Sequence, residues 1–220
     1  MTLIWIVLAV ALLPLGVGAT AVLLAGGRPP RPTGLGFHSI SRTRRAHLSY
    51  IGERTFETFL ARLQSRGITP RTLTDFAAAP GANRGVLLTF DDGLLDAYEH
   101  AFPLLERFGM KATFFPIAGA LGRRTRTEVF RPLRHAHAEH LREIAASGHE
   151  IGSHSLTHAD LTLLDRKELE RELRDSKRIL EDILGQGVTS LSFPYGGWND
   201  RVWRTARDLG YRRATVYRRR

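Results

Sequence analysis

The hydrophobic positions of the chain follow two alternating periods, and this alternation predicts the order of its strands and helices. Short apolar runs bounded by turn residues, such as residues 86–90 and 188–193, are typical of buried strands. Segments with apolar residues three and four positions apart lie between such runs and predict helices. The clearest of these segments is residues 166–184. Asp165 just before it and Glu168 in its first turn have the spacing of a capping box. Repeated strand–helix units predict an α/β fold with a parallel sheet, either open or closed into a barrel.

The same patterns place the remaining elements. We expect further strands at residues 36–40, 112–117, 150–152 and 211–216. Further helices are expected from a cap at Thr55, at residues 94–108 and 139–147, and from a cap at Asn199.

The N-terminal segment has a different pattern, because residues 2–27 carry no charge. As a helix rising ~1.5 Å per residue, such a segment can cross the ~30 Å core of a bilayer. We therefore expect a membrane anchor or signal segment at residues 1–27, with residues 3–25 in the membrane, a Pro/Gly linker at 28–36 and one domain at 37–220. An anchor is favoured over a cleaved signal peptide, because the apolar run is long and no small-x-small cleavage site follows it. The arginines after the segment favour a cytoplasmic side, which conflicts with a substrate outside the cell.

Two polar motifs each follow a short apolar run, so both lie where predicted strands end. The first contains Asp91 and Asp92, and the second contains His154 and His158. Active sites of parallel α/β barrels lie at this end of the strands. Asp92, His154 and His158 supply three ligands with open positions for a divalent metal, with Zn²⁺ expected first and Co²⁺, Ni²⁺ or Fe²⁺ as alternatives. Asp91 is then available as the base for an attacking water.

Two other interpretations of these residues remain. The histidine pair can also lie on the solvated face of a helix. The three ligands are also those of a redox iron site, but Asp91 favours hydrolysis because an oxygenase has no evident use for a base there.

Together with residues 192–196 (Ser-Phe-Pro-Tyr-Gly), the two motifs resemble the polysaccharide deacetylase, or NodB-homology, family from about Phe37 to Tyr217. The resemblance implies a distorted (β/α) barrel with fewer than eight strands and a metal-dependent hydrolase that removes N-acetyl groups. It also implies that the backbone N–H of Tyr195 stabilises the oxyanion, on a turn that Pro194 shapes.

Two features depart from the family pattern. Ser192 stands where the family often has an arginine that contacts the catalytic aspartate, and the closing Leu-x-His motif, which supplies the general acid, is absent. Because only three arginines follow Tyr217, we expect a barrel that is incomplete at its C-terminus and has an exposed edge. The alternative function is accordingly a truncated, catalytically impaired carbohydrate-binding remnant.

Further histidines and one tryptophan are weaker candidates for the site. His38 ends a predicted strand, and its Phe-His pair resembles the biofilm-polysaccharide branch of the family, so we expect it to line the site. Trp198 can stack on a sugar ring, with core packing as the alternative. His135, His137 and His140 precede a predicted helix and are expected in a solvated loop.

Composition restricts the partners. The absence of cysteine excludes a disulfide framework and a thiolate metal site. The formal charge of +10 comes without a basic stripe interleaved with aromatics, so no nucleic-acid partner is expected. A plain solvated surface is favoured as the explanation of this charge over attraction to anionic wall polymer or membrane.

The combined expectation is a membrane-anchored, extracytoplasmic deacetylase. Its substrate is an acetylated polysaccharide: poly-N-acetylglucosamine first, with peptidoglycan or chitin-like chains as alternatives. A peripheral basic membrane protein without a site is the third hypothesis. The oligomeric state is not predicted.

Overall fold

The computed structural model describes residues 18–24, 32–41, 50–78, 86–125 and 133–217. Its main sheet consists of β1 (Gly18–Leu24), β2 (Pro32–Phe37), β5 (Leu87–Asp92), β6 (Thr113–Pro116), β9 (Glu150–Ile151), β10 (Ser190–Ser192) and β11 (Arg213–Tyr217). Two short pairs stand apart from it: β3 (Ser39–Ser41) with β4 (Tyr50–Gly52), and β7 (Arg124–Thr125) with β8 (Leu133–Arg134). The helices are α2 (Glu53–Ser65), α3 (Leu73–Ala78), α4 (Phe102–Arg107), α5 (Ala138–Ala146), α6 (Arg166–Leu184) and α7 (Asp200–Asp208), with single turns η1 (Ala97–Ala101), η2 (Ala118–Ala120) and η3 (Pro194–Gly196).

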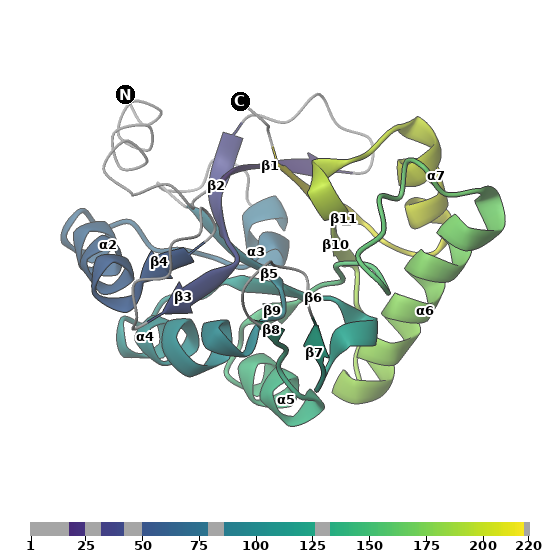
Figure 1. Ribbon diagram of the computed structural model, residues 1–220. Coiled ribbons are helices and arrows are strands. Elements are labelled where there is room, and N and C mark those ends of the chain that lie inside the picture. Colours follow the sequence, from purple (N-terminus) through teal and green to yellow (C-terminus); the bar gives the residue numbers. More distant parts are fainter. Residues whose placement is uncertain (1–17, 25–31, 42–49, 79–85, 126–132, 218–220) are drawn as a thin grey trace.

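The seven strands close into a barrel with the longer helices around it (Figure 1). Their order is β10-β11-β1-β2-β5-β6-β9. Ser153, just beyond β9, joins the two ends of this order: its N–H donates to Ser190 O, and Ser192 N–H donates to Ser153 O, both at 2.9 Å. The predicted α/β barrel with fewer than eight strands is therefore confirmed.

Strand direction determines where a site can form. Every neighbouring pair is parallel except those of β1, which runs antiparallel to both β11 and β2. The C-terminal ends of the six parallel strands therefore share one rim of the barrel, and both predicted motifs lie at this rim.

The predicted transmembrane helix is wrong, because residues 18–24 form a strand of the barrel. An uncharged apolar run is typical of a barrel strand as well as of a membrane helix, and hydrophobicity alone does not distinguish the two. Within the described ranges, no helix combines the length and hydrophobicity needed to cross a bilayer. The rest of the predicted anchor, residues 1–17 and 25–27, lies outside the described residues, as do residues 28–31 of the predicted linker, whose residues 32–36 belong to β2.

The expected gap after the last strand is also wrong. β11 pairs with β10 on one side and with β1 on the other, in a register that runs from Thr20 opposite Tyr217 to Leu24 opposite Arg213. The N-terminal segment thus occupies the edge that the C-terminal residues leave open, and the barrel has no exposed edge at β11.

The alternation of side chains along the strands separates the outer core from the barrel interior. In β5, Leu88 and Phe90 belong to the main hydrophobic cluster under the helices, so Leu87, Thr89 and Asp91 face the opposite way, into the barrel. The same period places Ser190 and Ser192 of β10 inside the barrel, where they are fully buried. Small and polar side chains leave room within the barrel for a buried site.

Helix ends follow local sequence only in part. Asp165 and Glu168 form the predicted capping box of α6, and Asn199 caps α7 through Val202 N–H. Thr55 is not a cap, because α2 already begins at Glu53. The predicted helix at residues 94–108 is divided into the π turn η1 and α4, which has a proline in its first turn, where the missing N–H of proline is tolerated.

Candidate active site

The two carboxylates come from the end of β5. Asp91 is fully buried in the barrel interior, and the next two residues turn sharply, with φ of +68° at Asp92 and +65° at Gly93. A Cβ atom on Gly93 would lie 2.6 Å from the Pro116 side chain, so only glycine fits there. The turn sends the Asp92 side chain toward the histidines that follow β9.

The two histidines lie in a loop after β9, which excludes the interpretation of a solvated helix face. His154 N–H donates to Pro116 O at 3.0 Å, and His158 N–H donates to the Ser155 hydroxyl at 3.0 Å. Ser155 and His158 have φ of +64° and +65°. These left-handed turns bring both rings to the same side of the loop, with centroids 4.8 Å apart.

Three ligand atoms converge at the rim. Asp92 Oδ1 lies 3.5 Å from His154 Nε2 and 3.5 Å from His158 Nε2, and one ligand atom from each residue lies within 4.8 Å of the others. Ligands at ~2.0–2.1 Å from one tetrahedral ion are separated by about 3.3 Å. Asp92 Oδ1 is also buried, and no group in the described part of the chain donates a hydrogen bond to it. The donor set and its spacing therefore fit a divalent metal.

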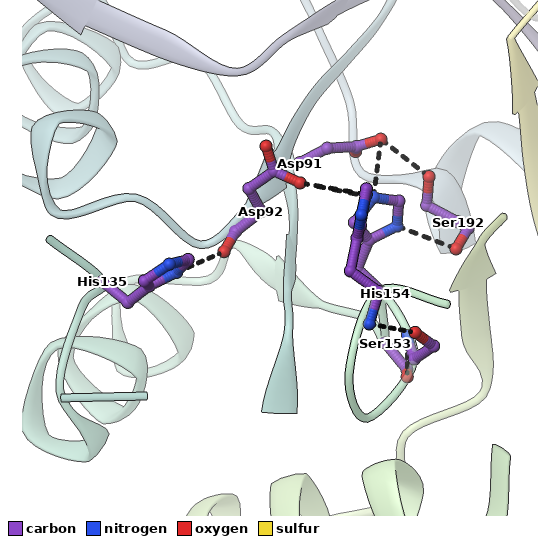
Figure 2. Close-up of polar contacts among 8 residues, drawn as sticks. Asp91, Asp92, His135, Ser153, His154 and Ser192 are labelled. Carbon is purple, nitrogen blue, oxygen red and sulfur yellow. Dashed lines mark hydrogen bonds and ion pairs between the residues drawn. The ribbon is translucent and has the colours of Figure 1, made fainter. Parts of the chain in front are cut away.

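A hydrogen bond orients one imidazole toward Asp92, and burial keeps the other neutral. His154 Nδ1–H donates to Ser192 O at 2.9 Å, which leaves Nε2 free to face Asp92 (Figure 2). Burial, followed by the neighbouring His154, lowers the pKa of His158 to about 4. A neutral ring with a free nitrogen is the ligand form of histidine.

Asp91 lies beside the three ligands without joining them. Its Oδ2 accepts a hydrogen bond from Ser192 Oγ at 2.8 Å and lies 3.9 Å from His154 Nε2. Burial raises the pKa of Asp91 above its ordinary value, although the nearby His154 and His38 act in the opposite direction. Ser192 stands where the family pattern often has arginine, so at this position a neutral hydroxyl contacts the carboxylate instead of a guanidinium.

We expect Asp91→Asn to stabilise the metal-free protein at neutral pH. The raised pKa means that the folded state releases its Asp91 proton less readily than the unfolded state, so stability falls as pH rises above the ordinary value of 3.8. The amide has no charge to bury. In thermal unfolding at several pH values, the variant should have the higher midpoint at pH 7, and this difference should vanish below the ordinary pKa of the aspartate. A difference in midpoint that does not vary with pH would contradict the burial of a charge.

Backbone strain is concentrated at this rim. The non-glycine residues with positive φ among the described residues are Asp92, Ser155, His158 and Tyr195. Each such residue costs on the order of 1–3 kcal/mol, and such strain is typical of functional sites.

The other predicted residues lie around the cluster. The Tyr195 ring is 4.6 Å from that of His158 and more than half exposed, on the turn that the buried Pro194 begins. Trp198 is 36% exposed and stacks on Phe193, so it has both an outer face and a packing role.

His38 follows β2, which pairs with β5 so that Phe37 lies opposite Phe90. The residues after this pair are His38 and Asp91, and His38 is close enough to influence the pKa values of both Asp91 and His158. The structure therefore places His38 at the site.

Glu172 was not found by sequence reasoning, because it belongs to the regular pattern of α6. Its buried carboxylate accepts hydrogen bonds from Leu156 N–H at 3.0 Å, Thr157 N–H at 2.9 Å and the Thr157 hydroxyl at 2.7 Å. It thereby holds the loop between His154 and His158. No local signal distinguishes it from the other glutamates of the helix.

We expect Glu172→Ala to lower the free energy of unfolding by about 2–4 kcal/mol, because it leaves two loop amides without their acceptor. Glu172→Gln should cost less, since its amide oxygen still accepts from them. Urea unfolding monitored by circular dichroism measures both variants. The matched control is Glu170→Ala, since over the residues that the structure describes this partly exposed glutamate of the same helix does not contact the loop and pairs only with Arg166 and Arg174. Equal midpoints for Glu172→Ala and Glu170→Ala would contradict the role of Glu172.

An aspartate–histidine–histidine cluster beside a buried carboxylate, at the C-terminal ends of barrel strands, is the arrangement of a metal-assisted hydrolase. The profile of the polysaccharide deacetylase family matches residues 78–214, and the chain belongs to this family. The resemblance drawn from the motifs is thereby confirmed.

Known proteins similar to the chain agree with this assignment. It is 30% identical over 199 residues to the putative polysaccharide deacetylase YxkH of Bacillus subtilis, covering 87% of this chain and 66% of that protein. The deacetylase PplD of Streptococcus pyogenes, solved in complex with acetate, has a TM-score of 0.69 at 25% identity, over 80% of this chain and 79% of that one. IcaB from Ammonifex degensii has a TM-score of 0.67 at 25% identity over the same shares.

The chain spans less than two thirds of the length of the curated relatives that it matches, such as 58% of a chitooligosaccharide deacetylase from Rhizobium leguminosarum.

Proposed function

We propose that this domain is a metal-dependent hydrolase that removes N-acetyl groups from a polysaccharide. The observation that carries the proposal is the convergence of Asp92, His154 and His158 at 3.5 Å separations beside the buried Asp91. Enzymes of this family depend on a metal, and the donor set present here suits Zn²⁺, with Co²⁺, Ni²⁺ or Fe²⁺ as alternatives. When bound, such an ion lowers the pKa of a coordinated water and polarises the acetamide carbonyl.

Asp91 is the proposed general base. Its Oδ2 is held by Ser192 and its Oδ1 receives no hydrogen bond from the described residues, so one carboxylate oxygen is available to take a proton from the attacking water. The raised pKa brings its proton affinity closer to that of an efficient base at neutral pH.

Tyr195 and Trp198 are proposed to contact the substrate. The turn η3 places the Tyr195 ring beside His158, and its backbone N–H is the proposed donor to the oxyanion that develops on the acetyl carbonyl. Pro194 fixes the start of this turn. The outer face of Trp198 offers a surface on which a sugar ring can stack.

His38 is the proposed general acid. It lies beside Asp91 across the β2–β5 pair, at the rim where the leaving amine must receive a proton. We expect His38→Gln to lower kcat on the order of 10²-fold, because the amide of glutamine cannot protonate the leaving amine. A folded, metal-loaded His38→Gln variant that keeps the kcat of the unsubstituted chain would contradict this role.

Several relatives bear names that suggest the substrate class. They include a peptidoglycan-N-acetylglucosamine deacetylase of Bacillus cereus and a chitin deacetylase of Arthroderma benhamiae. We propose a β-linked N-acetylglucosamine polymer as the substrate, with poly-N-acetylglucosamine first in view of His38 and of the similarity to IcaB. The domain would then act outside the cytoplasm, where such polymers lie.

The test is acetate release by the full chain loaded with Zn²⁺ or Co²⁺. It should be incubated separately with oligomers of β-1,6- and β-1,4-linked N-acetylglucosamine and with peptidoglycan. Release that depends on the metal supports the proposal, and the preferred polymer identifies the substrate. A folded, metal-loaded chain that releases no acetate from any of them but binds the oligomers would instead favour a carbohydrate-binding remnant.

A further inference from the structure

His135 lies in the barrel rim rather than in the solvated loop that the sequence suggested. It is only 3% exposed and follows β8, and its Nδ1 lies 3.0 Å from the backbone oxygen of Asp92 (Figure 2). On its other side, Nε2 lies 2.8 Å from the Thr125 hydroxyl of β7. The ring therefore bridges the β7–β8 pair and the turn that carries a proposed metal ligand.

The chemistry of the two partners fixes the direction of both hydrogen bonds. A backbone carbonyl can only accept, so Nδ1 carries the proton and donates to Asp92 O. In the neutral ring Nε2 then accepts from the Thr125 hydroxyl. Because the side chain is buried, water cannot readily replace either bond.

The turn at Asp92 needs such support. Two successive residues, Asp92 and Gly93, have left-handed backbone angles, and for Asp92 this conformation costs roughly 1–2 kcal/mol. The carbonyls of both residues accept hydrogen bonds from residues 135–136. The His135 ring donates to Asp92 O, and Ala136 N–H donates to Gly93 O at 2.9 Å. His135 thus contributes a side-chain bond to the residue whose carboxylate must face His154 and His158.

We propose that His135 is a positioning residue for the metal site, which locks Asp92 in the left-handed turn that aims its carboxylate at the two histidines. The inference rests on the proposed function, because it concerns the affinity of that site for its metal. It requires no contact between His135 and the substrate or the metal.

The test is metal affinity of the metal-free full chain, measured for Zn²⁺ and Co²⁺ by competition with a chromophoric chelator. His135→Leu fills a similar volume with an apolar side chain that cannot donate a hydrogen bond to Asp92 O. It should weaken metal affinity about 10–100-fold, the effect typical of losing a residue that orients metal ligands. His135→Asn places an amide N–H where Nδ1 stood and should stay within a few-fold of the unsubstituted chain. His135→Gln places its amide further out, toward Thr125, and should resemble the leucine variant.

His137→Leu is the matched control, since this exposed histidine stands two residues away and faces solvent. It should leave metal affinity unchanged. Circular dichroism and thermal unfolding establish that each variant is folded; if the leucine variant does not fold, the comparison of asparagine with glutamine decides the matter.

The inference is overturned if folded His135→Leu and His135→Gln variants bind metal as tightly as the unsubstituted chain. It is also overturned if His135→Asn binds metal as weakly as His135→Gln. It is also overturned if the unsubstituted chain binds no divalent metal. Failure of the proposed function looks different: metal binds, the variants differ as expected, and yet no polymer yields acetate.

Discussion

Replacing Asp91 with asparagine is expected to lower kcat for acetate release by about 10²–10⁴-fold, the usual contribution of a positioned general base. The substitution is nearly isosteric, and the amide oxygen of asparagine can still accept the hydrogen bond that Ser192 Oγ donates at 2.8 Å. The variant therefore keeps the packing of the barrel interior but cannot take a proton from the attacking water. Metal affinity should change little, because Asp91 is not among the three converging ligands.

The measurement pairs this variant with Asp92→Asn, which alters the neighbouring carboxylate. Acetate release and bound metal should be determined on the same samples. We expect Asp91→Asn to lose activity and retain metal, whereas Asp92→Asn should lose both, since the Oδ1 atom of Asp92 is one of the three proposed ligand atoms. If Asp91→Asn keeps its activity, the base lies elsewhere. If it loses metal in proportion to activity, Asp91 is a ligand.

Deletion of residues 1–31 is expected to abolish cooperative folding, because it removes β1 from between two strands. Residues 20–24 pair with β11, and residues 18–21 pair with β2. Each buried backbone group left without a partner costs about 1–3 kcal/mol, whereas the whole stability of a domain is about 5–15 kcal/mol. Loss of both ladders also leaves two open edges that can pair with other chains.

Thermal and urea unfolding monitored by circular dichroism would test this, with size-exclusion chromatography to detect aggregation. The matched control is deletion of residues 1–17, which leaves β1 in place and should keep a single cooperative transition. A chain lacking residues 1–31 that unfolds cooperatively at the same midpoint as this control would show that β1 is dispensable to the barrel.

Local sequence was sufficient for features that depend on neighbours in the chain. The capping box of Asp165 and Glu168 and the cap at Asn199 are formed by residues three positions apart, so their spacing alone predicts them. Strands β5, β6, β10 and β11 were found in the same way, within one or two residues at each end, because a buried strand needs only a short apolar run between turns. The strand predicted at residues 36–40 instead covers the end of β2 and the start of β3.

The N-terminal segment shows where this reasoning fails. An uncharged apolar run is typical of a membrane helix and also of a strand within a barrel. Its hydrophobicity does not show which of the two residues 18–24 form. The strand is formed here because β11 and β2 each have an edge to pair.

By itself the sequence predicted the α/β barrel and the residues of the candidate site. Two aspartates and two histidines at the ends of apolar runs must meet at one rim if the strands are parallel. Tertiary structure alone decided how these residues are held. Ser192 reaches Asp91 across 101 positions in the sequence, and His135 reaches Asp92 across 43. Such hydrogen bonds depend on the register of strands and the path of loops, which no pattern of neighbouring residues specifies.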